Sequence, residues 1–124
     1  MTFQCLRNGQ VLILDTTFGT NQFNYKLAAI GCLSGNGKSH PVAVALIKQQ
    51  ESNDFEWMLE CMRAKLDSHD SRAWSRIRTW ITDGDAAMEL ALAANSPDSF
   101  HMRCVFHITM NVRIELNQSN QNLK

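Results

Sequence analysis

The sequence has no excess of basic charge. Lysine and arginine together number 12, aspartate and glutamate also number 12, and the formal net charge at pH 7 is zero. A protein that holds DNA unaided usually needs a clear basic excess, because much of its affinity comes from contacts with phosphates. The composition therefore excludes a self-sufficient DNA-binding module. If this chain acts on nucleic acid, we expect other segments to supply the affinity.

Long apolar runs and closely paired cysteines are also missing. The longest fully apolar run near the N-terminus is Val11–Leu14, which is too short for a signal peptide or a membrane span. Four cysteines are scattered without a Cys-x-x-Cys pair, so we expect reduced thiols in the cytosol or nucleus and no membrane association. Three of them, Cys5, Cys32 and Cys61, are expected to be small buried hydrophobes.

The chain does contain enough apolar material for one packed core. It has 124 residues, of which 44% are hydrophobic, and this length corresponds to a single domain. Such a domain should bury roughly two thirds of its unfolded surface, which excludes wholesale disorder. We place the domain at residues 1–116 and expect the Asn/Gln-rich residues 117–124 to be a disordered tail.

Three apolar segments separated by turn residues open the domain, at 11–14, 25–33 and 41–47. The Asn36–Gly37 pair supplies strong turn chemistry, so the segments predict an antiparallel meander. The stretch around this turn superficially resembles a phosphate-binding loop. The required first glycine is replaced by Cys32, however, so we expect a hairpin and no bound nucleotide.

The apolar period then changes from strand to helix. Residues 54–66 present one apolar helical face, made of Phe55, Met58, Leu59, Met62 and Leu66. Ser52, Asn53 and Asp54 are candidate N-caps. The following segments predict a loop (67–76), a strand (79–82), a helix (86–94) and a strand (100–106). The order βββ-α-β-α-β indicates an α/β fold with a mixed sheet.

The final apolar segment is ambiguous. Apolar and polar residues alternate from Phe106 to Leu116, which taken alone predicts a strand. Ile108, Val112 and Leu116 nevertheless share one helical face, and both alternatives remain open on periodicity.

Two aspartates follow apolar strands in equivalent positions. Asp15 and Asp83 each occupy the carboxyl end of a predicted strand, and right-handed crossovers would set these two strands side by side. We therefore expect the carboxylates to lie within about 6 Å of each other. Paired carboxylates bind Mg²⁺ or Mn²⁺, and two such ions can support phosphoryl transfer. The alternative is helix capping, because Asp83 and Asp85 precede a helix.

Two weaker patterns involve a cysteine–histidine pair and a cluster of arginines. Cys104 and His107 have the spacing of zinc ligands, but no second pair exists, so we expect a structural role and no zinc. Arg72, Arg76 and Arg78 form the one basic cluster interleaved with aromatic residues. They are either weak DNA-phosphate contacts or part of a solvated loop, with the neighbouring Trp80 in the core.

Motifs along nearly the whole chain resemble a known family. Asp15–Asn21 resembles the D-T-T-Y/F-x-T-N opening of Mutator-like (MULE) transposase domains, and Pro41–Leu46 resembles their third strand. Phe55–Leu59 is similar to the F-x-W-x-L helix, Ile81–Met88 to the I-T-D-x-D-x-A block, and Cys104–His107 to the C-x-x-H block. These motifs occur in family order across residues 11–116.

The resemblance implies a ribonuclease H-like fold and a catalytic triad of two Asp and one Glu. Asp15 matches the first Asp and Asp83 the second. The remaining positions that the resemblance places near the site, without a ligand role, are Asn21, Asp85, Cys104 and His107. The implied chemistry is Mg²⁺- or Mn²⁺-dependent cleavage and transfer of DNA strands in the nucleus, with transposon ends bound through segments outside this chain.

One departure from the family limits this inference. The family Glu lies well beyond the C-x-x-H block on a later helix, and Glu115 is too close to His107 to be that residue. We therefore expect an incomplete triad, a chain truncated after the C-x-x-H block, and a helix after His107. The alternatives are a non-catalytic, DNA-associated transcription regulator or an inactive transposon remnant.

Overall fold

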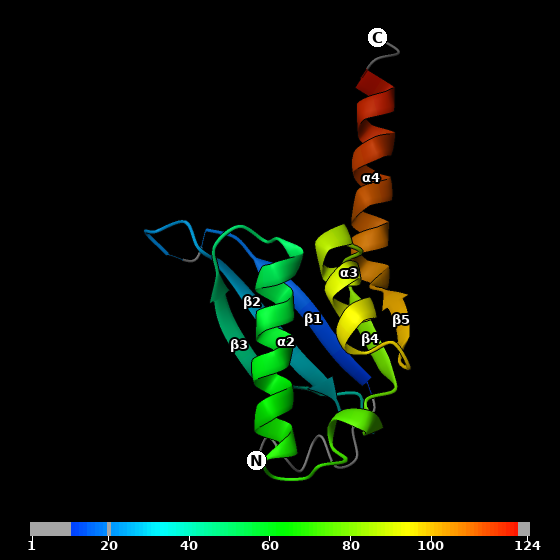
Figure 1. Cartoon of the computed structure of the whole chain (residues 1–124). Helices are drawn as coiled ribbons and strands as arrows, with labels where there is room; N and C mark the ends of the chain where they lie inside the picture. The colour runs from blue at the N-terminus through cyan, green and yellow to red at the C-terminus, as the bar shows by residue number, and fades with distance from the viewer. Residues whose placement is uncertain (1–10, 20, 122–124) are drawn as a thin grey trace.

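The computed structural model describes residues 11–19 and 21–121, which form an α/β domain with one mixed sheet (Figure 1). The described elements, in chain order, are β1 (Val11–Thr17), β2 (Lys26–Leu33), β3 (Ser39–Ile47), α2 (Ser52–Asp67), the 3₁₀ helix η1 (Trp74–Arg76), β4 (Thr79–Thr82), α3 (Ala86–Asn95), β5 (Phe100–Arg103) and α4 (Val105–Gln121). This order confirms the predicted βββ-α-β-α-β and resolves its last element as a helix.

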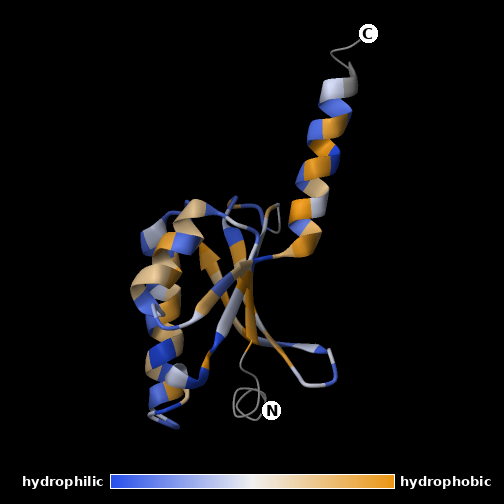
Figure 2. Cartoon of the chain, turned by 90° about the vertical axis from the view of Figure 1, so that its right-hand side faces the viewer, coloured by the Kyte–Doolittle hydropathy of each residue, from blue (hydrophilic) through white to orange (hydrophobic). Residues whose placement is uncertain are grey.

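The sheet has the strand order β3-β2-β1-β4-β5. The β1–β2 and β2–β3 pairs are antiparallel, whereas β1–β4 and β4–β5 are parallel. The prediction that the fourth strand lies beside the first, opposite the meander, is confirmed. Figures 1 and 2 show α2 and α3 on the same face of the sheet, while α4 projects away from it.

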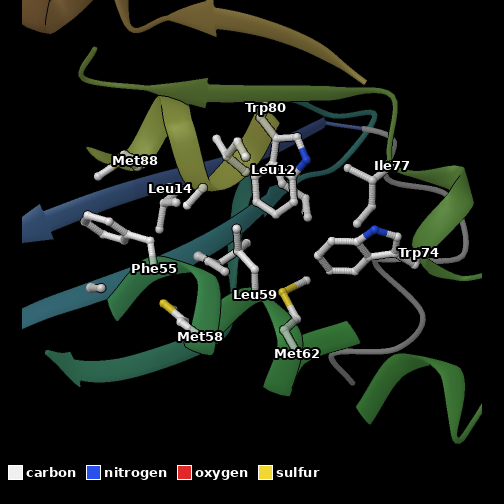
Figure 3. Packing of buried hydrophobic residues seen from close by; sticks show 14 of the residues in the cluster. Leu12, Leu14, Phe55, Met58, Leu59, Met62, Trp74, Ile77, Trp80 and Met88 are labelled. Atoms are coloured by element: carbon white, nitrogen blue, oxygen red, sulfur yellow. The ribbon is translucent and has the colours of Figure 1, made fainter. Parts of the chain in front are cut away.

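The core lies between this sheet face and the two helices (Figure 3). Alternation along β1 turns Leu12 and Leu14 inward, where both are fully buried. All five residues of the predicted α2 face are buried against them. Trp80 is also fully buried, as expected, and its indole N–H donates to Ser96 Oγ at 3.2 Å. That bond offsets the cost of removing the N–H from water.

Some boundaries differ from the predictions. The N-cap of α2 is Glu51 rather than any of residues 52–54, and Asp54 instead stabilises the N-terminus from inside the helix, accepting the Glu51 N–H at 3.3 Å. Strand β5 ends at Arg103, not at Phe106, because the Cys104 carbonyl already accepts a helical hydrogen bond.

Whether each cysteine is buried follows from its place on a strand or helix. Cys32 is buried in β2 as predicted. The burial predicted for Cys61 is wrong, because this residue falls between the core-facing positions of α2 and is exposed. Cys5 lies outside the described residues.

The prediction of a disordered tail at 117–124 is wrong for residues 117–121, which are helical. Helix α4 continues through this polar stretch, since each added residue gains a backbone hydrogen bond once a helix has nucleated. The side chains of residues 117–119 are exposed, and Ser119 Oγ donates back to the Glu115 carbonyl at 2.9 Å. Residues 122–124 lie outside the described part of the chain. Among the described helices, none combines the length and apolarity that crossing a bilayer requires.

Candidate carboxylate site at the sheet edge

The parallel pairing of β1 with β4 determines where the two candidate aspartates lie. Val11 pairs with Thr79 and Ile13 with Ile81, a constant offset of 68 residues. The observed pairing ends at Ile13 and Ile81; the same offset, extrapolated by two residues, would put Asp15 level with Asp83, which directly follows β4 (83 − 15 = 68). If β4 kept its pleat for one residue beyond Thr82, the two carboxylates would share a sheet face. Neighbouring strands lie about 4.8 Å apart, which is compatible with the predicted carboxylate separation.

Asp15 lies inside a strand rather than at its end. Its antiparallel pairing partner on β2 is Ala29, and the β1–β2 ladder continues to Thr17. The prediction that β1 stops at Asp15 is therefore wrong, because the meander extends the strand beyond its last hydrogen-bonded partner on β4. The Asp15 side chain remains 47% exposed, and its Oδ1 accepts the Thr16 N–H at 2.9 Å.

Asp83 follows β4 directly and shapes a tight turn. Its Oδ1 accepts the Asp85 N–H at 2.9 Å, an Asx turn that fixes the carboxylate relative to the backbone. Gly84 lies between the two aspartates with φ +92°, a conformation that disfavours side chains. The Thr82 hydroxyl oxygen accepts the Gly84 N–H at 3.3 Å. The turn therefore presents Asp83 at the carboxyl end of β4.

The capping role belongs to Asp85. Its Oδ1 accepts the Met88 N–H at 3.0 Å at the start of α3, and its Oδ2 accepts a hydrogen bond from Gln50 Nε2 at 3.0 Å. Both Asp85 oxygens are thus engaged in holding α3 and the segment before α2. Because Asp85 caps the helix, the capping alternative does not apply to Asp83.

The C-x-x-H block lies at the junction between β5 and α4, beside Asp15. The Cys104 N–H donates to the Thr82 carbonyl at 2.6 Å, which ties the junction to the end of β4. His107 Nε2 lies 3.9 Å from Asp15 Oδ1. His107 Nδ1 is buried and has no hydrogen-bond partner among the described residues. The junction thus brings Cys104 and His107 to the carboxylate edge.

Asn21 organises the loop between β1 and β2. Its Nδ2 donates to the Tyr25 carbonyl at 2.7 Å, and its Oδ1 accepts the N–H groups of Phe23 and Tyr25, each at 3.1 Å. These bonds describe a structural role in the turn that follows Asp15.

The arginines predicted as weak DNA contacts lie at the other end of β4. Arg72, Arg76 and Arg78 all precede Thr79, and the four residues of β4 span about 13 Å. Arg76 Nη1 pairs with Asp70 Oδ2 at 2.8 Å. Figure 1 shows η1 and the start of α4 at opposite ends of the sheet. The structure therefore does not bring these arginines to the carboxylates.

The carboxylate oxygens of Asp15 and Asp83 would suit a hard cation, but two carboxylates are a small set of ligands. Carboxylate oxygens are the ligands that Mg²⁺ and Mn²⁺ prefer, and Mg²⁺ commonly uses one or two carboxylates and keeps several waters. Across residues 11–19 and 21–121, no three His, Cys, Asp or Glu side chains gather closely enough to hold a metal ion. Asp15 and Asp83 are thus candidate ligands, and a metal site built on them would need a further donor.

Sequence reasoning missed Arg103. A Cβ on Gly84 would lie only 2.9 Å from Arg103 Nε, so the arginine side chain packs directly over the turn between Asp83 and Asp85. Arg103 Nε also pairs with Glu89 Oε1 at 3.1 Å. The glycine of the T-D-G-D stretch signals a positive φ, but nothing local indicates which side chain covers it.

The fold is an α/β domain with a mixed sheet, in which the two candidate aspartates lie on or directly after the neighbouring parallel strands β1 and β4. Comparison with known proteins identifies the family. The sequence matches the MULE transposase domain over residues 11–111, and the chain belongs to this family. The predicted family is therefore confirmed.

A curated relative also matches. Over 103 residues the chain is 24% identical to the PKS-NRPS hybrid synthetase cheA of Chaetomium globosum. The match covers 83% of this chain and 2% of that protein. This chain therefore spans a very small part of the relative.

Proposed function

We propose that this chain forms part of a ribonuclease H-like transposase catalytic core, which cleaves and transfers DNA strands. Asp15 and Asp83 would hold Mg²⁺ or Mn²⁺, and a further carboxylate would come from outside the described residues. The observation that carries this proposal is the parallel β1–β4 pairing, whose 68-residue offset, if extended by two residues, would bring the two aspartates opposite each other. Membership in the MULE transposase domain family supports DNA as the partner. Transposon ends and a nuclear location are parts of the same proposal.

The described residues would do most of the positioning. The Asx turn orients Asp83, the β2 ladder holds the backbone of Asp15, and the Cys104–Thr82 bond keeps His107 beside Asp15. When bound, the metal supplies Lewis-acid activation of the phosphodiester and of the attacking oxygen. The protein's part is therefore to hold two ligands on rigid strands before substrate arrives, which limits the reorganisation needed during reaction.

A metal titration tests the ligand assignment. Mn²⁺ binding would be followed by electron paramagnetic resonance for the wild type, Asp15→Asn, Asp83→Asn and Asp98→Asn. We expect weak, millimolar-range binding by the wild type and its loss in both site variants, because each removes one of only two charged ligands. Asp98→Asn removes the same charge elsewhere and should bind like the wild type. Unchanged binding by both site variants would contradict the assignment.

A second candidate function is a non-catalytic, DNA-associated regulator or an inactive remnant. It is favoured by one observation: within the described residues, no group of three His, Cys, Asp or Glu side chains lies close enough together to hold a metal ion. A plasmid-nicking assay with Mn²⁺ tests whether the 124-residue chain contains a complete catalytic site. We expect no nicking by the 124-residue chain alone, whichever function holds, whereas robust cleavage would show that residues within this chain complete the site.

A further inference from the structure

Arg103 is held against the turn that carries Asp83. Its Nε and Cδ lie 2.9 and 3.1 Å from the position that a Cβ on residue 84 would take, so any side chain there would require the arginine to shift. The residue after it, Cys104, is tied through its backbone to Thr82 at 2.6 Å. Arg103 is therefore paired through its strand with Thr82, and its side chain lies over the Gly84 turn.

The ion pair between Arg103 and Glu89 contributes little to folding stability. A gain in stability therefore does not explain where Arg103 lies. The two side chains are 60% and 38% exposed, and exposed pairs contribute little to folding because water screens them. The 3.1 Å contact uses Nε and directs the guanidinium along α3. Within the described residues, Glu89 is the only ion-pair partner of Arg103, and it contacts Nε rather than the outer nitrogens. The pair orients the guanidinium and leaves two nitrogens able to donate.

The chemistry of the surroundings indicates what those nitrogens would bind. Asp83 adjoins the Gly84 turn that Arg103 covers, so an anionic substrate near this carboxylate needs a compensating cation. A guanidinium presents parallel N–H donors that match the two oxygens of a phosphate. His107 lies beside Asp15, while Arg103 covers the turn at Asp83. Arg103 is thus the guanidinium that the fold attaches to the carboxylate edge.

We propose that Arg103 binds a backbone phosphate of the DNA strand that enters the carboxylate site. This inference rests on the proposed function and deepens it, because it names the group that positions the substrate on the Asp83 side. It replaces Arg72, Arg76 and Arg78 as the predicted phosphate contact, since those residues lie at the opposite end of β4. Glu89 would act as a positioning residue that keeps the guanidinium over Gly84.

Nuclear magnetic resonance of the arginine side chains tests the contact directly. The full chain would be titrated with a short DNA duplex at low salt while the Nε–Hε signals are followed. We expect the Arg103 signal to shift most and to saturate, with Arg78 and the α4 residue Arg113 shifting little. A uniform small shift of all arginine signals, or no shift at Arg103, would overturn the proposal.

Substitutions of Arg103 measure how much the contact contributes to DNA affinity. Arg103→Ala should weaken duplex binding about tenfold, as expected for loss of one charge-assisted contact, and should reduce the slope of log affinity against log salt by about 0.9. Arg103→Lys should recover part of the affinity, because it keeps the charge but loses the paired donors. Arg113→Ala removes the same charge from an exposed helix and should change the slope much less. Equal losses for Arg103→Ala and Arg113→Ala would overturn the proposal.

A failure of the phosphate-contact proposal can be distinguished from a failure of the proposed function. Arg103 is not a metal ligand, so Arg103→Ala should leave Mn²⁺ binding intact. Mn²⁺ binding that depends on Asp15 and Asp83, with DNA binding insensitive to Arg103, would refute the phosphate contact and leave the carboxylate site standing. Mn²⁺ binding that is insensitive to both aspartates would refute the proposed function itself.

Discussion

Helices α2 and α4 have similar lengths, 16 and 17 residues, but opposite relations to the rest of the domain. Apolar residues of α2 recur with the helical period and are buried against the sheet. Apolar residues of α4 alternate, and those from Val105 to Leu116 are between 40% and 73% exposed. Figure 2 shows this alternation along a helix that extends away from the sheet.

The difference shows how periodicity, rather than apolar content, decides which helix packs. At about 100° per residue, an alternating pattern distributes side chains over two nearly opposite faces. In α4 one stripe contains Val105, Ile108, Val112 and Leu116, and the other contains Phe106, Met110 and Ile114. A single sheet face can cover only one such stripe. An isolated helix of this length is only marginally stable in water, whereas α2 gains its stability from packing.

Hydrogen exchange should show the largest contrast between the two helices. We expect central amides of α2 to open with a free energy close to that of global unfolding, about 5–15 kcal/mol for a domain. Central amides of α4 should exchange with opening free energies near zero, because no described residue packs over its apolar stripes. Native-state exchange measured by nuclear magnetic resonance checks this. Comparable protection in α2 and α4 would contradict the comparison.

A matched pair of leucine truncations should give the next largest effect. Leu59→Ala in α2 removes a fully buried side chain and should lower the free energy of unfolding by about 2–5 kcal/mol. Leu116→Ala in α4 removes a side chain that is 59% exposed and should change it by less than about 0.5 kcal/mol. Urea denaturation of both variants measures the difference. Similar losses would mean that α4 packs in solution.

An effect of intermediate size is expected in helix α3, because a single side chain, Asp85, caps its N-terminus. Asp85→Ala removes the acceptor of the Met88 N–H and the partner of Gln50, and should cost about 1 kcal/mol. Asp98→Ala removes an exposed aspartate and serves as the control, with an expected change below about 0.5 kcal/mol. Thermal unfolding of the two variants would reveal whether Asp85 is in fact the cap.

The smallest effect is expected at the metal site. Asp83→Asn keeps the oxygen that accepts the Asp85 N–H and removes one of two like charges, so the metal-free melting temperature should be unchanged or slightly higher. Millimolar Mg²⁺ should raise the wild-type melting temperature only slightly, because two carboxylates bind it weakly. The Asp83→Asn variant should lose that rise. A calorimetric melting series with and without Mg²⁺ measures both quantities, and a rise retained by the variant would count against Asp83 as a ligand.

Local patterns explain what could be predicted from the sequence. The apolar face of α2, the turn at Asn36–Gly37 and the position of Asp83 after β4 all follow from residues near one another in the chain. The C-terminal boundary of β1 could not be predicted, because the strand continues past Asp15 through its pairing with β2. The contact of Arg103 with Gly84 was equally inaccessible, since it joins residues on different elements. In α4 the alternating pattern pointed to a strand, and the backbone formed a helix despite it.

The register between β1 and β4 also has a consequence for the order of folding. The meander from β1 to β3 needs only short loop closures, whereas pairing β1 with β4 closes a loop of 68 residues. The chain entropy of that closure is about 4 kcal/mol by the logarithmic loop law. The two aspartates should therefore meet late, after the hairpins and α2 have formed. A register slip by one residue at that step would turn Asp15 to the opposite sheet face, so a cation that bridges both carboxylates would select the correctly paired strands.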